Sequence, residues 1–188
     1  MPDQPDEEHQ LLKAAQQGEV DAFGRLYERH AAAIFRYLFA HLGSRPDAED
    51  MTSEVFLRAW QSLPRYHQRG VPFRAYLFRV AHNALVDAYR RRRDNPRLSL
   101  EEYGDPASEQ DGPVEALSGK TEQAELASVL AEMKDEYRTV LVLRFLSQLS
   151  PAETAVVMQR SPGAVRVLQH RALEAARQML AKKKEEGK

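Results

Sequence analysis

The residues best suited to chemistry follow Ser161-Pro162, near the C-terminal end of the sequence. A serine side chain caps free helix amides and proline suits the first helical position, so a helix is predicted to begin here. Its first exposed turns carry no carboxylate, although acidic side chains normally suit the positive end of a helix dipole. They carry instead Gly163, Arg166, Gln169 and His170. This end of the helix is therefore predicted to bind an external anion.

A second short helix is predicted just upstream, over Pro151–Met158. Ser150 can cap its first amides while Glu153 reaches back to the Ser150 amide, which forms a capping box. With the tight connection through Gln159-Arg160, the two helices form a helix-turn-helix unit, whose second helix meets base edges in the major groove of DNA. Bare amides, arginine and histidine suit phosphate and guanine acceptors there. The alternative is a simple helical hairpin in which Gln169 and His170 only face solvent.

Arginine and aromatic residues are interleaved over residues 73–94, FRAYLFRVAHNALVDAYRRRRD. One inner stripe of this predicted helix consists of Phe73, Leu77, Val80, Ala84 and Ala88. Other faces then present Arg74, Phe78, Arg79, His82, Asn83, Val86, Tyr89 and Arg90. Bases of unpaired nucleic acid stack on aromatic rings while arginine holds the backbone, so this helix is predicted to bind single strands. The alternative places the aromatic rings in the core and leaves the arginines as a solvated helix end.

An acidic helix is predicted to begin after the cap residue Ser44: Pro46 opens it, and Asp47, Glu49 and Asp50 in its first turns complement the helix dipole. Met51, Val55 and Arg58 can line a face beside Asp50 and Glu54. An acidic face with apolar neighbours suits a basic, helical partner protein. A solvated turn that only satisfies the helix dipole is the alternative.

Apolar residues recur at helical spacing almost everywhere, so the fold is predicted to be all-α. Together with 151–158, the expected helices span 11–17, 21–42, 46–61, 73–93, 122–133, 136–147 and 162–180. Residues 94–120 hold three prolines and seven acids with few bulky apolar groups, which is typical of a flexible linker. We therefore expect two small helical domains, over 10–93 and 121–181, joined by an acidic linker over 94–120. A disordered acidic tail over 1–9 is expected to precede them, and a charged tail over 182–188 to follow.

The charge distribution supports two anion-binding surfaces. Residues 69–97 hold eight arginines against two acids, and residues 137–188 hold ten basic against four acidic side chains. The segment 98–136 between them has eleven acids and two lysines. Nucleic acid is the partner that this pattern favours.

Several function classes are disfavoured by the sequence. It contains no cysteine, so disulfides and thiolate metal sites are excluded, and we expect no cofactor and no metal. Its apolar runs are far shorter than a membrane helix and its acidic N-terminus is unlike a signal peptide, so no membrane insertion is expected and a cytoplasmic location is predicted. Its six histidines are scattered and no phosphate loop or nucleophile motif is present, so we expect no catalytic activity.

Three stretches together resemble one family, the sigma-70 family of RNA polymerase sigma factors, and within it the extracytoplasmic-function group. DAEDMTSEVFLRAW resembles the helix with which that family binds core polymerase. PFRAYLFRVAHNALVDAYRRRR resembles its promoter-melting helix, and LSPAETAVVMQRSPGAVRVLQHRAL resembles its minus-thirty-five-binding helix-turn-helix. The three occur in family order, and the resemblance covers about residues 10–93 and 121–181.

The resemblance implies a role for each stretch. Contact with the clamp helices of the polymerase's largest subunit would fall to Asp50, Met51, Ser53 and Glu54. Opening and holding of the minus-ten element would fall to Arg74, Tyr76, Arg79, His82, Asn83, Arg90 and Arg91. Binding of the minus-thirty-five element would fall to Ser161, Gly163, Arg166, His170 and Arg171. The family also implies contact with the flap of the second-largest subunit and regulation by an anti-sigma factor.

Three residues depart from the family pattern. Ser53 stands where the family often has glutamine, and Gln169 replaces a frequent apolar residue, so Leu168 is expected to provide the packing. Gln159 stands where the turn usually has glycine, which costs about 1 kcal/mol if the position requires a positive φ. The main alternative function is a helix-turn-helix transcriptional regulator whose N-terminal domain binds a ligand or dimerises.

Overall fold

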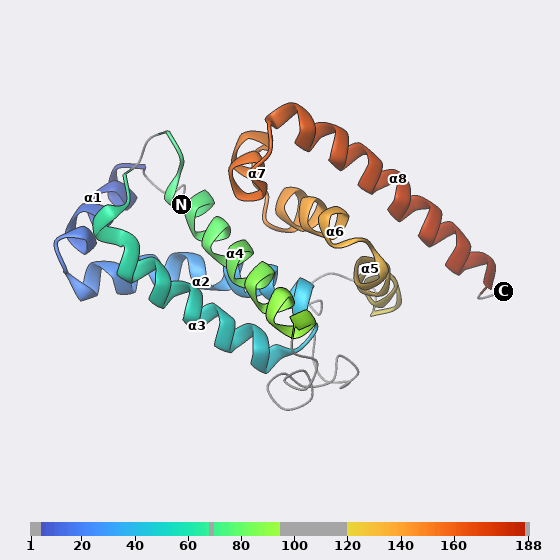
Figure 1. The fold of residues 1–188 in the computed structure, drawn as a ribbon, viewed down its shortest axis with the longest axis horizontal. Coiled ribbons are helices and arrows are strands. Elements are labelled where there is room, and N and C mark those ends of the chain that lie inside the picture. Colours follow the sequence, from blue (N-terminus) through green and yellow to red (C-terminus); the bar gives the residue numbers. More distant parts are fainter. Residues whose placement is uncertain (1–4, 68–69, 95–119, 187–188) are drawn as a thin grey trace.

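The computed structural model describes residues 5–67, 70–94 and 120–186 (Figure 1). Its described residues contain helices and no strand, which confirms the all-α fold. In chain order the elements are α1 (Pro5–Gln16), α2 (Val20–Leu42), α3 (Arg45–Ser62), the 3-10 turn η1 (Leu63–Arg65), α4 (Phe73–Asp94), α5 (Lys120–Glu132), α6 (Asp135–Leu141), the π-helical turn η4 (Val142–Leu146), α7 (Pro151–Met158) and α8 (Pro162–Glu186).

The helix ends follow the local signals in the sequence. Ser44 accepts a hydrogen bond from the Asp47 amide at 3.5 Å at the start of α3. Gly43 ends α2 in the left-handed conformation, with φ of 70°, which a glycine adopts without strain. At α7 the capping box is complete, because Ser150 and Glu153 exchange hydrogen bonds of 2.7 and 3.1 Å. The predicted bounds of α7 are therefore confirmed, whereas α8 continues beyond Leu180 to Glu186.

The predicted helix over 136–147 divides into two elements. The α-helical part ends at Leu141, and the chain continues as the π-helical turn η4 to Leu146. A π-helical turn inserts one extra residue into a helix and changes which side chains face inward. Val142 and Leu143 are consequently buried, while Phe145 is 54% exposed.

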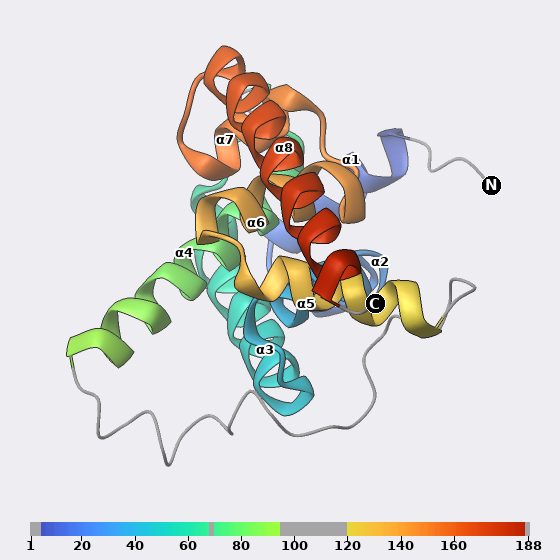
Figure 2. The ribbon, with the colours of Figure 1, turned by 90° about the vertical axis from the view of Figure 1, so that its right-hand side faces the viewer.

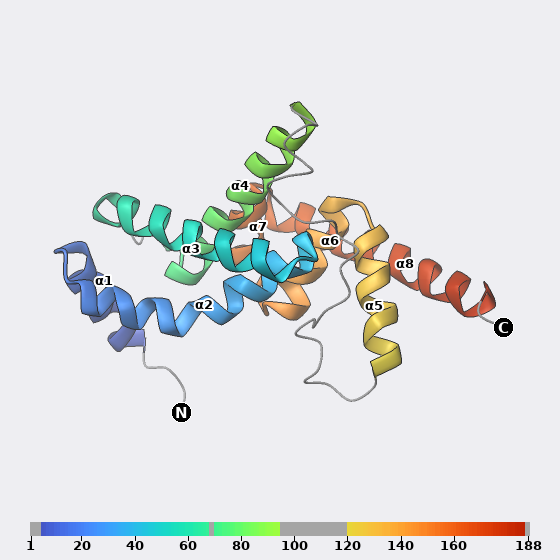
Figure 3. The same cartoon turned by 90° about the horizontal axis from the view of Figure 1, so that it is seen from below.

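The four N-terminal helices form a bundle around one apolar core (Figure 3). Helix α2 packs between α1 and α3, and α4 packs against both α2 and α3. The largest fully buried side chains of this bundle include Leu26, Ile34, Tyr37, Leu38, Phe73 and Phe78. Burial of this apolar surface is what fixes the orientation of α3 and α4.

The C-terminal helices pack directly on this bundle instead of standing apart (Figure 2). Helix α7 lies against α4, and η4 and α5 contact α2. Four C-terminal residues belong to the same apolar cluster as the N-terminal bundle: Val142, Leu143, Leu149 and Val157. The C-terminal helices also have an apolar core of their own. That core is smaller, and it is centred on Val129, Val140, Val165, Leu168 and Ala172.

Polar contacts also join the two regions. Thr139 on α6 lies 3.1 Å from Nε2 of His41 on α2, and both side chains are buried. The guanidinium of Arg138 donates to the carbonyl of His41 at 3.4 Å and to carbonyls at the end of α5, which satisfies this buried cation. Arg74 at the start of α4 donates to the carbonyl of Ser147. The contact is therefore both apolar and hydrogen-bonded.

The predicted linker over 94–120 lies outside the described residues, apart from the helix ends at Asp94 and Lys120. Of the acidic tail predicted over 1–9, residues 1–4 also lie outside them, whereas residues 5–9 are helical and form the start of α1. Within the described ranges, no helix combines the length and apolar character that a bilayer crossing requires.

Candidate functional site

The acidic face predicted on α3 is present and open. Asp50 and Ser53 are exposed, and the Glu54 side chain is 37% exposed. Leu57, one turn further on the same side, is 57% exposed although it is a large apolar residue. Leu57 was not among the predicted site residues, although its spacing of seven residues from Asp50 places it on the same helix face. The face thus combines acids with an apolar side chain.

Met51 does not belong to this face. Its side chain is 2% exposed and packs in the apolar core of the bundle. In the packed chain Met51 therefore offers no surface to a partner, and its predicted contact with the polymerase stays a prediction. The residue lies on the inward side of α3, in the same stripe as Val55.

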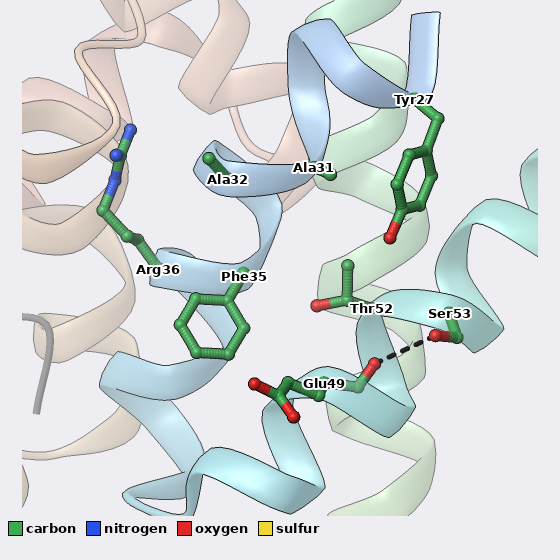
Figure 4. A pocket seen from close by; sticks show the side chains of 8 residues that line it. All are labelled: Tyr27, Ala31, Ala32, Phe35, Arg36, Glu49, Thr52 and Ser53. Carbon is green, nitrogen blue, oxygen red and sulfur yellow. Dashed lines mark hydrogen bonds between the residues drawn. The ribbon is translucent and has the colours of Figure 1, made fainter. Parts of the chain in front are cut away.

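A groove of about 440 Å³ borders the acidic face, between α2 and α3 (Figure 4). Its lining combines aromatic and small side chains with polar ones: Tyr27, Ala31, Ala32, Phe35, Arg36, Glu49, Thr52 and Ser53. Ser53 donates to the Glu49 carbonyl at 3.1 Å, so its small side chain stays on α3 and leaves the groove open. A glutamine at position 53, as the family often has, would be longer. The Ser53 departure therefore widens the groove beside the acidic face.

A chain of charges connects this face with α4. The Arg58 guanidinium lies 2.5 Å from the Glu54 carboxylate and 3.7 Å from that of Asp87 on α4. Asp87 is in turn 3.7 Å from the guanidinium of Arg90. All four side chains are at least 37% exposed, so each pair contributes little to stability. The network nevertheless places the acidic face of α3 beside the basic end of α4.

One stripe of α4 points away from the core. Its exposed residues follow the helical repeat of three and four: Arg79, Asn83, Val86 and Arg90. Arg91 is also exposed. Val86 is 50% exposed and was not among the predicted site residues. The stripe offers cations, an amide and an apolar side chain to a partner.

Three other predicted α4 residues are engaged within the protein. Tyr76 is 8% exposed, and its hydroxyl bonds to that of Ser62. His82 is half-buried with Nδ1 at 3.0 Å from the Tyr37 hydroxyl, and burial lowers its pKa. Arg74 donates to Ser147 and lies over the Phe78 ring at 5.8 Å. In this packed form all three side chains are engaged within the protein, and their predicted roles at the minus-ten element stay predictions.

The helix-turn-helix at the C-terminal end has the predicted geometry. Ser161 Oγ accepts from the Ala164 amide at 3.1 Å and so caps α8. Val165, Leu168 and Ala172 are buried and form the inner stripe of α8. The candidate binding residues all remain exposed: Ser161, Gly163, Arg166, His170 and Arg171. Helix α8 therefore presents a cationic first half to its surroundings.

Two departures from the family pattern have structural explanations. Gln159 adopts φ of 52° and ψ of 45° after α7, which is the left-handed conformation that glycine favours. The Gln169 side chain accepts a hydrogen bond from Nε of Arg144 at 2.9 Å, and Arg144 also donates to the Leu149 carbonyl. Gln169 thus joins α8 to the turn before α7. Leu168, 6% exposed, provides the packing as predicted.

Family models match both halves of the chain. The model described as Sigma-70 region 2 matches residues 26–95, and the model described as Sigma-70, region 4 matches residues 123–175. The chain belongs to the sigma-70 family. The first match contains α3 and α4 with the acidic face and the exposed stripe, and the second contains the helix-turn-helix.

Similar sigma factors place the chain in the extracytoplasmic-function group. It is 33% identical to the ECF sigma factor BldN of Streptomyces coelicolor over 171 residues, which is 91% of this chain and 65% of BldN. It is 35% identical to SigD of Mycobacterium tuberculosis over 172 residues, 87% of this chain and 79% of SigD. The solved structure of CnrH with the cytosolic domain of CnrY superposes with a TM-score of 0.71 at 28% identity, covering 94% of this chain and 98% of that one. The chain is an ECF-type RNA polymerase sigma factor.

Proposed function

We propose that this sigma factor divides its work among three exposed surfaces. The acidic face of α3, with Asp50, Ser53, Glu54 and Leu57, binds the clamp helices of the core polymerase. The stripe on α4 binds the single-stranded minus-ten element, and the first half of α8 binds the duplex minus-thirty-five element. The observation that supports this division best is the α4 stripe, because a helix that only stabilises a bundle has no need of Arg79, Asn83, Val86 and Arg90 on one open face.

The α4 stripe fits unpaired DNA better than duplex DNA. Arg79 and Arg90 can hold two phosphates along a strand, and Asn83 between them can exchange hydrogen bonds with a base edge. Val86 adds an apolar surface on which a base can stack. The alternative function, a helix-turn-helix regulator whose N-terminal domain dimerises or binds a ligand, would not require this exposed stripe.

The packed arrangement has to open before both promoter elements are bound. The minus-ten and minus-thirty-five elements are about 25 base pairs apart, which is roughly 85 Å along duplex DNA. A compact chain of this length has a radius of gyration of about 16 Å, too small to reach both. The 25 residues from 95 to 119 can cover a comparable distance when extended, at about 3.3 Å per residue.

Opening also releases residues of the minus-ten surface. Arg74 loses its partner carbonyl on Ser147 when α7 and η4 leave α4, and becomes available to DNA phosphates. Separation exposes Val142, Leu143, Leu149 and Val157, so another protein surface has to cover these side chains. Core polymerase, through its flap as well as its clamp, is the partner proposed to do so.

We further propose an anti-sigma factor as the regulatory partner, acting with the sigma factor in the cytoplasm. CnrH, whose structure this chain resembles, was solved in complex with the cytosolic domain of CnrY. A protein that stabilises the packed arrangement would keep Arg74 bonded to Ser147 and unavailable to DNA. The sigma factor itself supplies specificity and performs no chemistry.

Charge reversal on α3 tests the polymerase assignment. Asp50→Arg places a cation on the exposed acidic face and is expected to weaken core binding by more than about tenfold, because attraction becomes repulsion. Glu185→Arg, at an exposed acid in the last turn of α8, is the matched control and should bind normally. Circular dichroism checks that both variants fold, and transcription in vitro with core polymerase on genomic promoter fragments checks initiation. Normal core binding by folded Asp50→Arg would refute the assignment.

A further inference from the structure

Helix α8 carries an apolar side chain at the centre of its open face. Val167 is 53% exposed and lies between Arg166 and the buried Leu168 in the sequence. Positions three or four apart share a helix face. The face opposite the buried stripe contains Gly163, Val167, His170 and Glu174. All four of these residues are exposed.

The open face has a limited length. His170 pairs with Glu174 at 3.6 Å, and both side chains are more than half exposed. A carboxylate repels DNA phosphates, so the part of the face suited to DNA ends before Glu174. It comprises about two turns, with Gly163 and Val167 along its middle and Arg166 and Arg171 on its two sides. Single exposed apolar residues are common on proteins, but this one occupies the middle of the surface that would enter the groove.

Gly163 is not required by the fold. It is helical, and a Cβ atom added there would meet only Ser161 Oγ, at 3.9 Å. Glycine is a poor helix former, so alanine would suit this position better in the isolated protein. The absence of a side chain at this exposed position therefore leaves room for an external molecule to approach the helix backbone closely. Gly163 lies one turn before Val167 on the same face, so such a molecule would also contact Val167.

We propose that Val167 is a specificity-determining residue that contacts the 5-methyl group of a thymine in the minus-thirty-five element, and that Gly163 allows the helix to approach closely enough for this contact. Thymine is the only DNA base that presents a methyl group in the major groove, and apolar side chains recognise it there. Arg166 at one side of Val167 is positioned for a neighbouring guanine. This inference rests on the proposed binding of the minus-thirty-five element by α8.

Replacement of thymidine by deoxyuridine tests the contact, because it removes the methyl group and leaves base pairing unchanged. The holoenzyme is bound to a promoter fragment that it transcribes, with each thymine of the upstream element replaced in turn. Wild-type binding should weaken about three- to fivefold at one position, the loss expected for one buried methyl group. Val167→Ala should bind thymidine and deoxyuridine fragments equally. Val167→Thr, which keeps a methyl group at the same place, should retain part of the preference.

Two matched controls separate a specific contact from a general effect. Val20→Ala makes the same change at a valine that is 71% exposed on α2, and it should retain the thymine preference. Gly163→Ala should fold normally and weaken binding to all fragments by about tenfold. Gly24→Ala, at a helical glycine in α2 with nothing within 4 Å of the added Cβ, should bind as the wild type does.

The outcomes distinguish this inference from the proposed function. Suppose that the holoenzyme transcribes the fragment. If no deoxyuridine then changes wild-type binding, or if Val167→Ala keeps the wild-type preference for thymidine, Val167 does not contact a methyl group and the sigma function still stands. Normal binding by Gly163→Ala refutes the close approach. If no promoter fragment is bound or transcribed, the proposed function fails and this inference fails with it.

Discussion

Helices α4 and α8 are both basic and both carry candidate DNA-binding residues, yet they differ in how much of that surface is open. On α8, all five candidate residues are exposed, because only one side of the helix packs against the other helices. On α4, the bundle covers one side and α7 covers another, so Tyr76 is buried and Arg74 is bonded to Ser147. The comparison teaches that a basic, aromatic helix reveals its binding face only when all its packing partners are known.

The difference also assigns different roles to the two helices in the proposed mechanism. Duplex DNA is present from the start, and α8 is ready for it. Single-stranded DNA appears only after promoter opening, and α4 acquires its full surface only after α7 leaves. Changes at the contact between α4 and α7, and at the helix ends beside it, are therefore expected to alter stability and polymerase binding.

Acidification is expected to weaken the contact between the two regions. The Tyr37 carbonyl can only accept, so Nδ1 of His41 donates to it at 2.8 Å, and Nε2 of the neutral ring accepts from Thr139 across the interface. Burial lowers the pKa of His41 from 6.5 to about 4, against the opposing effect of the Tyr37 bond. The unfolded chain therefore binds the proton more readily. Stability is full above pH 6.5 and is lost as pH falls toward 4, by about 3 kcal/mol in total.

Urea unfolding between pH 7.5 and about 4 measures this loss. His41→Gln should show a flatter dependence in that window, because position 41 then has no titrating group, and the slope that remains comes from other groups such as His82, whose pKa burial also lowers. His170→Gln, at a histidine whose side chain is 74% exposed, is the control and should follow the wild type. An unchanged pH dependence in His41→Gln would contradict the assignment.

Removal of one hydroxyl group is expected to tighten the same contact. Thr154 is fully buried on α7, one turn before Val157, and its Oγ1 has no hydrogen-bond partner among the described residues. An unsatisfied buried hydroxyl costs about 1–3 kcal/mol, so the nearly isosteric Thr154→Val should stabilise the packed chain by about 1–2 kcal/mol. Its melting temperature should rise by a few degrees, and core polymerase should bind more weakly because opening costs more.

Thr52→Val is the matched control for this change. Thr52 is also buried, but its hydroxyl donates to the Ala48 carbonyl at 2.6 Å. The substitution should therefore be neutral or destabilising. A melting temperature that falls in Thr154→Val as well would show that the hydroxyl has a partner after all.

The smallest expected effect concerns the turn between α7 and α8. Gln159→Gly relieves the left-handed conformation at φ of 52° and should raise stability by up to about 1 kcal/mol without a change in promoter preference. Gln178→Gly, at an exposed position inside α8, should have the opposite sign, because glycine disfavours a helix interior. Thermal unfolding compares the two variants. Equal destabilisation in both would mean that the turn is not strained.

The sequence by itself determined the helices and their local ends. Ser150 with Glu153, Ser161 before Pro162, and Gly43 act over three or four residues, so no knowledge of the rest of the chain is needed to interpret them. The open face of α8 followed from the same local logic, because one apolar stripe implied one packed side. The family, the all-α fold and the positions of the three candidate surfaces were accordingly predictable.

Only the tertiary structure decided which side chains those surfaces present. Met51 and Tyr76 have residue types and spacings that fit a partner-facing role, yet both are buried. Helix α4 has apolar residues on more than one side, and periodicity alone does not show that α7, more than fifty residues later in the chain, covers one of them. The π-helical turn at Val142–Leu146 likewise rotates side chains in a way that the apolar pattern does not reveal. Local hydrogen bonds act over a few residues, whereas burial depends on all the surfaces that the folded chain brings together.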